Sequence, residues 1–122
     1  MSKRIMVVDD DPDILQVLKD RLDSYGYTVE TANDGREALD SLRREAFDGV
    51  ILDIRMPEID GMEVLRQIRE SHSVVPVVMI TASTIQDRAV EAVGKGAQAY
   101  LLKPFNAAQL KQVVERWFGP AM

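Results

Sequence analysis

The stretch Gly49-Val-Ile-Leu-Asp53 is short, almost entirely apolar, and ends in an aspartate. Continuous apolar runs of this kind are typical of strands that are buried on both faces. After a loop, Asp60-Gly61 precedes a segment in which Val64, Leu65 and Ile68 recur at helical spacing. The stretch therefore predicts a buried strand, a loop and a helix.

The same pair of patterns recurs along the whole chain. Further strands are predicted at Ile5–Val8, Thr28–Thr31, Val74–Ile80 and Ala99–Leu102. Apolar residues at helical spacing follow as Ile14/Leu15/Leu18/Leu22, Ala38/Leu39/Leu42, Ala89/Val90/Val93 and Leu110/Val113/Val114/Trp117. The helix start signals are Asp11-Pro12, a capping box of Asp34 with Glu37, and another of Asn106 with Gln109.

Five strand–helix units in alternation predict an α/β fold with parallel strands, right-handed crossovers and helices on both faces. Five strands fit the flavodoxin-like, doubly wound order 2-1-3-4-5. The length of 122 residues is that of one domain, so residues 1–122 are expected to form a single unit. In such sheets the functional crevice lies at the carboxyl ends of the strands.

Composition excludes several classes of function. With 20 acidic and 15 basic residues, the net charge of −5 argues against a nucleic-acid surface. The absence of cysteine excludes disulfides and thiol chemistry, and the one histidine, His72, is expected on the surface rather than as a phosphodonor. The longest uncharged apolar run, Val74–Ala82, is far shorter than the ~20 residues that a membrane helix needs. Because the N-terminus does not resemble a signal peptide, a cytoplasmic location is expected.

The predicted strand ends carry complementary chemistry. Asp9 and Asp10 follow the first strand and Asp53 ends the third, and these two strands are neighbours in the order 2-1-3-4-5. Thr81 and Lys103 follow the fourth and fifth strands. Two carboxylates ~4 Å apart repel by about 4 kcal/mol at an effective dielectric constant near 20, so a cation must compensate. Both Lys103 and a hard divalent cation such as Mg²⁺ suit that role.

At this point the residues resemble a known family, the response-regulator receiver domains of two-component signalling. The resemblance covers Lys3 to about Phe118. It rests on Val7-Val-Asp-Asp10, Ile51-Leu-Asp-Ile-Arg-Met-Pro57, Asp60-Gly61, Thr81-Ala82 and Lys103-Pro-Phe105. Each motif alone is weak, but four in this order at strand ends are highly specific.

The resemblance implies a phosphorylation site. Asp53 corresponds to the phosphoacceptor. Asp10 corresponds to the acid that coordinates Mg²⁺ directly, and Asp9 to the acid that acts mainly through a bound water. The backbone carbonyl of Arg55 corresponds to a further ligand, and Mn²⁺ is expected to substitute for Mg²⁺. A phosphoryl group on Asp53 would be contacted by Lys103, by the Thr81 hydroxyl and by the backbone N–H of Ala82.

The resemblance also implies a switch. Thr81 would move toward the phosphoryl group, and Tyr100 corresponds to the aromatic residue that responds. The residues at Arg55 and Ser83 are expected to tune the lifetime of the phosphoryl group, and the Lys103–Pro104 peptide bond is expected to be cis. The predicted fourth helix, 86–93, is short and thinly apolar, which favours movement.

Partners follow from the same resemblance. The donor would be a sensor histidine kinase or a histidine phosphotransfer protein, and the target an output domain or a downstream protein. Phosphorylation-dependent homodimerisation through the fourth helix, fifth strand and fifth helix is a further expectation, with no direct contact to nucleic acid or membrane. The chain would catalyse only its own phosphorylation and dephosphorylation.

Three alternatives use related architecture. A flavodoxin would cradle phosphate in the loop after the first strand, but Asp9-Asp10-Asp11-Pro12 would repel it. An aspartyl-phosphate hydrolase normally has a second acid two residues after its nucleophile, where this chain has Arg55. A receiver-like protein-binding module that acts without phosphorylation remains the alternative function.

Overall fold

The structure is a computed structural model that describes residues 2–71 and 73–122, so the expectation for His72 lies outside the described residues. One sheet of five parallel strands has the order β2-β1-β3-β4-β5, which confirms the prediction. The strands are β1 (Arg4–Val8), β2 (Thr28–Ala32), β3 (Gly49–Asp53), β4 (Val77–Ala82) and β5 (Ala99–Lys103). The helices are α1 (Pro12–Ser24), α2 (Gly35–Arg44), α3 (Gly61–Glu70), α4 (Gln86–Gly94) and α5 (Ala107–Phe118).

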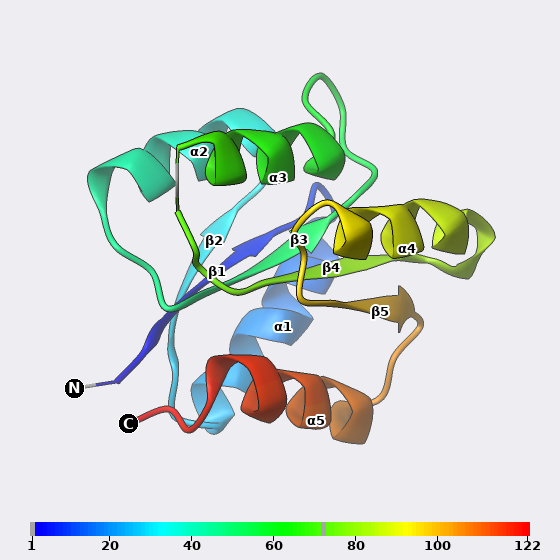
Figure 1. The fold of residues 1–122 in the computed structure, drawn as a ribbon. Coiled ribbons are helices and arrows are strands. Elements are labelled where there is room, and N and C mark those ends of the chain that lie inside the picture. Colours follow the sequence, from blue (N-terminus) through cyan, green and yellow to red (C-terminus); the bar gives the residue numbers. More distant parts are fainter. Residues whose placement is uncertain (1, 72) are drawn as a thin grey trace.

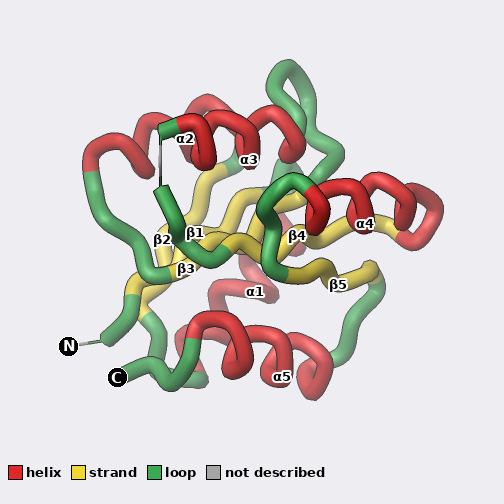
Figure 2. Tube along the Cα trace, in the orientation of Figure 1, coloured by secondary structure: helices red, strands yellow, loops and turns green. Residues whose placement is uncertain are grey.

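The sheet is sandwiched between two layers of helices (Figures 1 and 2). Helices α1 and α5 cover one face, and α2, α3 and α4 cover the other. Side chains alternate along a strand. Ile5 and Val7 therefore join the core under α1 and α5, whereas Met6 and Val8 join the core under α2, α3 and α4. The central strands are therefore buried on both faces, which explains their continuous apolar sequences.

The strand register determines which residues meet at the carboxyl edge. Val8 pairs with Leu52 between β1 and β3, so the residues that follow, Asp9 and Asp53, end adjacent strands at the same level. Ala82 pairs with Lys103 between β4 and β5. The acids, the hydroxyl and the lysine predicted for the site therefore converge at one edge of the sheet.

Side-chain caps start most of the helices. The carboxylates of Asp11, Asp34 and Asp60 accept backbone N–H bonds at the starts of α1, α2 and α3. At α5, Asn106 and Gln109 form the complete capping box that the sequence predicts. At α2, the Glu37 carboxylate accepts no bond from the Asp34 N–H among the described residues, so that predicted box is only half complete.

The predicted strand over Val74–Ile80 was too long at its start. β4 begins at Val77, and Val74 is 89% exposed. Proline has no N–H to donate to a sheet, so Pro76 marks the boundary. The Pro76 carbonyl still accepts the N–H of Val50 at 2.9 Å, a backbone hydrogen bond to β3 just before β4 begins.

The predicted apolar face of α4 was also wrong in part. Ala89 and Ala92 are fully buried against the sheet, whereas Val90 and Val93 are 54% and 40% exposed. The two alanines lie three residues apart and form the face that packs on the sheet. This helix is therefore anchored by two small side chains.

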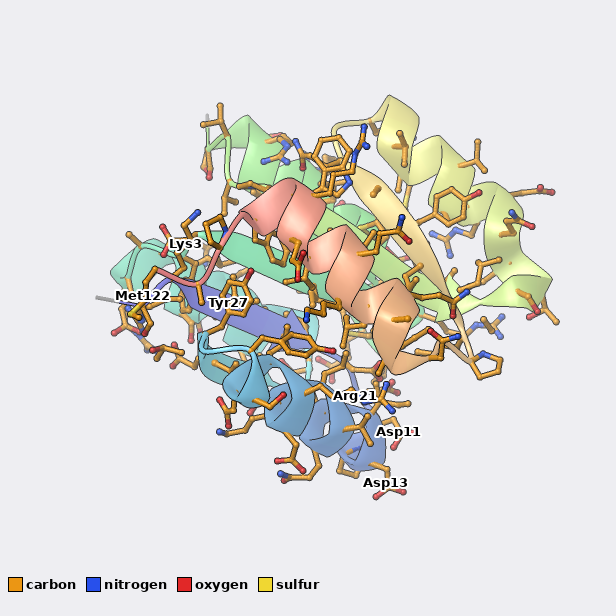
Figure 3. The ribbon with its side chains drawn as sticks, turned by 90° about the horizontal axis from the view of Figure 1, so that it is seen from below. Lys3, Asp11, Asp13, Arg21, Tyr27 and Met122 are labelled. Carbon is orange, nitrogen blue, oxygen red and sulfur yellow. The ribbon has the colours of Figure 1, made fainter. Side chains whose placement is uncertain are left out.

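The two ends of the described chain lie together. Lys3 donates its N–H to the Ala121 carbonyl at 2.6 Å and its ammonium to the Phe118 carbonyl at 2.6 Å, and the Tyr27 hydroxyl bonds the Gly119 carbonyl. Figure 3 shows Lys3, Tyr27 and Met122 at the end of the molecule opposite Asp11 and Asp13. This arrangement leaves the carboxyl edge of the sheet open. Among the described helices, none combines the length and apolarity required to cross a bilayer.

Candidate functional site

Three carboxylates meet at the carboxyl ends of β1 and β3. Oxygens of Asp9, Asp10 and Asp53 lie within 4.8 Å of one another. Asp9 is fully buried and Asp53 is 4% exposed, whereas Asp10 faces solvent. Asp9 also accepts the Asp11 N–H at 2.9 Å, which fixes the turn that leads into α1. Oxygen ligands of this kind suit a hard divalent cation, so the donor set fits Mg²⁺.

Lys103 supplies the positive charge inside this cluster. Its ammonium lies 2.9 Å from Asp9 Oδ2 and 3.4 Å from Asp53 Oδ2, and its side chain is 23% exposed. Burial favours the neutral amine, but the hydrogen bond to Asp9 and the two carboxylate charges outweigh it and raise the pKa of Lys103. Lys103 therefore stays charged and partly offsets the repulsion between the acids.

Asp53 has an unusual proton affinity. Burial and the neighbouring charge of Asp9 raise its pKa to about 6, although Lys103 acts in the opposite direction. Its Oδ1 accepts the backbone N–H of Arg55 at 3.4 Å. At neutral pH the carboxylate is mostly ionised yet held in a place where its negative charge is poorly solvated.

The hydroxyl group of Thr81 lies in the same cavity as the acids. Thr81 is fully buried, and its Oγ1 has no hydrogen-bond partner among the described residues. A buried polar atom without a partner is costly, and such atoms point to a role that another group completes. Thr81 lines a cavity of about 350 Å³ together with Asp9, Asp10, Asp11, Asp53, Arg55, Ala82, Ile85 and Lys103. The cavity therefore joins acceptors, a cation and a free donor.

The loop after Asp53 is packed tightly against the phosphoacceptor candidate. A Cβ at Gly61 would lie 2.1 Å from the Asp53 carbonyl oxygen, so no side chain fits there. The N–H of Gly61 donates to the Ile54 carbonyl at 2.7 Å. The start of α3 thus supports the backbone at the end of β3, which explains the Asp60-Gly61 signature.

The remaining predicted residues occupy outer positions. The Arg55 side chain is exposed at the mouth of the cavity. Ser83 lies in an exposed 3₁₀ turn, Ser83–Ile85, and does not line the cavity. Tyr100 is half-buried on β5, and its hydroxyl accepts the Gln86 side-chain N–H at 3.1 Å. The Lys103–Pro104 bond is cis, as the resemblance implies.

Sequence reasoning missed some residues around this site. Ile85 lines the cavity, and Asp11 lines it as well as capping α1 through the Asp13 N–H. The contacts of Gln86 with Tyr100 and of Arg88 with Asp60 were also unforeseen. These pairs join segments far apart in the sequence, and no local pattern signals them.

Size alone does not identify the site. A larger groove of about 760 Å³ lies between α2 and α3 and is lined by residues such as Leu39, Phe47 and Ile68. Within the described residues, however, the acidic cluster with metal-ligand spacing is that of Asp9, Asp10 and Asp53. The smaller cavity carries the reactive groups.

Comparisons with known proteins agree with this geometry. The sequence profile of the response regulator receiver domain matches residues 5–115. The response regulator MprA of Mycolicibacterium vanbaalenii is 43% identical over 110 residues, which is 90% of this chain and 48% of that protein. The chain thus spans about half the length of this curated relative.

Two solved structures illustrate the match in three dimensions. Chemotaxis protein CheY4 of Vibrio cholerae superposes with a TM-score of 0.89 at 34% identity, covering 96% of this chain and 99% of that one. The receiver domain of sensor histidine kinase PA1611 from Pseudomonas aeruginosa gives 0.87 at 34% identity over 98% and 99% of the two chains. That structure is described with a magnesium ion coordinated in its active-site cleft. Fold, motif order and sequence similarity converge, and this chain belongs to the family of response regulator receiver domains.

Proposed function

We propose that this chain, over residues 1–122, is a receiver domain that accepts a phosphoryl group on Asp53 from a histidine donor. The observation that carries the proposal is the cavity in which Asp53, the Lys103 ammonium and the unpaired Thr81 hydroxyl face one space. A nucleophile, a charge partner and a free donor are what phosphoryl transfer requires from a protein.

The transfer itself needs little from the protein beyond positioning. An oxygen of the ionised Asp53 carboxylate forms a bond to phosphorus while the bond between phosphorus and the donor's imidazole nitrogen breaks. The electron pair of the broken bond stays on that nitrogen, which takes up a proton. A pKa of about 6 keeps Asp53 mostly ionised at neutral pH, so the nucleophile is ready.

Asp9, Asp10 and Asp53 are the residues that would hold Mg²⁺, with the Arg55 carbonyl as a further ligand and Mn²⁺ as a substitute. When bound, the cation supplies charge neutralisation between the acids and the phosphoryl oxygens. The three-carboxylate cluster supports this assignment, as does the magnesium described for the receiver domain of PA1611. This role would account for the placement of three acids where their charges repel one another.

Lys103 and Thr81 would bind the phosphoryl oxygens. Lys103 already lies 3.4 Å from Asp53, and the Thr81 hydroxyl gains the partner that it lacks. The backbone N–H of Ala82 would be a third donor. Phosphorylation replaces about one negative charge by two and adds acceptor oxygens, so these donors stabilise the modified state.

Movement of Thr81 toward the phosphoryl group would carry the signal outward. Thr81 and Ala82 end β4, and the 3₁₀ turn and α4, a helix anchored by two alanines, come next in the chain. Tyr100 would respond on β5, altering the surface of α4, β5 and α5. Arg55 at the cavity mouth and Ser83 in the turn would tune how quickly water removes the phosphoryl group.

The partners follow from this chemistry. A sensor histidine kinase or a histidine phosphotransfer protein would supply the phosphoryl group. The target of the switch would be an output domain, a separate downstream protein or a second copy of the chain. None of these requires enzyme activity beyond phosphorylation and dephosphorylation of Asp53.

Beryllofluoride, a phosphoryl analogue that binds carboxylates, tests the proposal. Mg²⁺ with beryllofluoride should raise the melting temperature of the wild type well beyond Mg²⁺ alone. Asp53→Asn should lose that increment. An equal response of wild type and Asp53→Asn would contradict the proposal and favour a binding module that works without phosphorylation.

A further inference from the structure

An ion pair joins the start of α4 to the residue that caps α3. Arg88 Nη2 lies 2.8 Å from Asp60 Oδ2, and the two side chains are 43% and 35% exposed. Arg88 belongs to the first turn of α4, and Asp60 is the residue that caps α3. The pair therefore bridges the helices that follow β3 and β4, the strands that end in Asp53 and Ala82.

Asp60 makes two contacts with its two oxygens. Oδ1 accepts the Glu63 N–H at 3.0 Å and caps α3, and Oδ2 binds Arg88. Burial tends to raise the pKa of Asp60, but the hydrogen bonds from Arg88 and the Glu63 N–H, together with the charge of Arg88, lower it overall. The next residue, Gly61, is in contact with the backbone of Asp53. Arg88 is thus tied to a segment that is itself fixed to the phosphoacceptor.

Little else holds the beginning of α4. No side chain caps it among the described residues, and the helix buries only Ala89 and Ala92. Gln86 contributes one hydrogen bond to Tyr100. The far end is fixed separately, because Arg69 donates to the Gly96 carbonyl from Nε at 3.1 Å and from Nη2 at 2.8 Å. A movement of α4 away from the start of α3 would therefore stretch or break the Arg88–Asp60 pair.

We propose that the Arg88–Asp60 ion pair is a latch that holds α4 in its unphosphorylated position and so limits how readily the domain switches. A contact present in one of two states shifts the equilibrium toward that state by its own free energy. In this structure the Thr81 hydroxyl has no hydrogen-bond partner among the described residues, and Arg88 is paired with Asp60. The latch thus opposes the movement that the phosphoryl group would drive.

The inference rests on the proposed phosphorylation of Asp53, so its test has two readouts. Arg88→Gln removes the latch cation, and Asp60→Asn removes the charge while keeping an oxygen that can cap α3. Lys95→Gln is the matched control, because this substitution also removes one positive charge. Lys95 follows α4 and pairs with Glu91 rather than with Asp60. Long-range effects on an anionic ligand are therefore common to Arg88→Gln and Lys95→Gln.

The first readout is the beryllofluoride concentration that half-saturates the domain with Mg²⁺. Arg88→Gln and Asp60→Asn should each lower it by about two- to fivefold relative to Lys95→Gln, the range expected for a partly exposed ion pair. The double variant should gain no more than either single one, because both remove the same contact. Equal values for Arg88→Gln and Lys95→Gln, or additive effects in the double variant, would overturn the latch.

The second readout needs no phosphoryl analogue. Amide hydrogen exchange over 89–93 in the unmodified protein should be faster in Arg88→Gln than in Lys95→Gln. If the wild type binds no beryllofluoride, the proposed function fails while this comparison still judges the latch. Identical exchange in the two variants would overturn it.

Discussion

Lys103 and Asp53 form a pair in which the cation is shared, since the ammonium lies 3.4 Å from Asp53 and closer, at 2.9 Å, to Asp9. One lysine therefore faces two buried carboxylates. Each carboxylate is stabilised less than it would be by a lysine of its own. Burial and the charge of Asp9 therefore outweigh Lys103, and the pKa of Asp53 stays raised to about 6. A further cation in the site would compensate the remaining negative charge of the carboxylates, and a phosphoryl group would then be bound by that cation and by Lys103.

Removal of the shared cation should expose this imbalance. Lys103→Met leaves Asp9 and Asp53 without compensation, and the free energy of unfolding near neutral pH should fall by about 2–4 kcal/mol. The loss should be smaller at about pH 5, because Asp53 is then mostly protonated. Urea unfolding at the two pH values checks this, and an equal loss at both would contradict the shared-charge account.

The raised pKa of Asp53 makes a second prediction for the metal-free protein. The folded state binds a proton at Asp53 more tightly than the unfolded chain, whose carboxyl has a pKa near 3.8. The wild type should therefore lose stability relative to Asp53→Asn as the pH rises from about 4 to about 6, by about 2–3 kcal/mol in total. Unfolding free energies of both proteins across this range measure the effect.

Mg²⁺ provides the control for that comparison. Near neutral pH it should restore much of the wild-type stability and act less on Asp53→Asn, because the ion favours the ionised cluster. A stability difference that does not vary with pH would show that the burial of Asp53 charge is not its cause.

Thr81 should behave differently with and without the phosphoryl analogue. Thr81→Val keeps the shape of the side chain and removes a buried hydroxyl that has no partner among the described residues. The unliganded protein should become more stable by about 1 kcal/mol, while beryllofluoride binding weakens about tenfold or more. Thr84→Val, at an exposed position of the following turn, should change neither quantity appreciably. A variant that binds beryllofluoride as tightly as wild type would remove Thr81 from the site.

Gly61 and Gly94 form a contrasting pair for backbone packing. A methyl group at Gly61 would collide with the Asp53 carbonyl, so Gly61→Ala should destabilise the fold by about 1–3 kcal/mol and reduce phosphoryl acceptance. Gly94 has nothing within 4 Å of such a group and ends α4, so Gly94→Ala should stabilise by up to about 1 kcal/mol. Melting temperatures of the two variants that move in the same direction would contradict this packing argument.

Local sequence patterns were sufficient for the strand order and for most of the acidic edge. A few residues suffice to predict a buried strand from an apolar run such as the one ending in Asp53, or a helix start from a cap such as Asn106. The start of β4 and the buried face of α4 were less accessible. Val74 is apolar and yet exposed, and Ala92 is small and yet fully buried, because tertiary contacts rather than hydropathy decide those positions.

The site residues divide along the same line. Asp9 and Asp53 lie at the ends of the adjacent strands β1 and β3, and Lys103 ends β5 at the same edge of the sheet, so the topology brings them to one edge. The Lys103–Asp9 and Arg88–Asp60 contacts join residues that are 94 and 28 positions apart, and the lack of a partner for the Thr81 hydroxyl among the described residues also depends on side-chain placement. Such contacts need the folded structure to be seen.

Intact mass spectrometry tests the central claim most directly. Wild type and Asp53→Asn are incubated with a small acyl-phosphate donor, each with Mg²⁺ and with a chelator. The account predicts the added mass of one phosphoryl group on the wild type, dependent on Mg²⁺, and none on Asp53→Asn. An equal gain on both proteins, or none on a wild type that binds beryllofluoride, would contradict Asp53 as the phosphoacceptor.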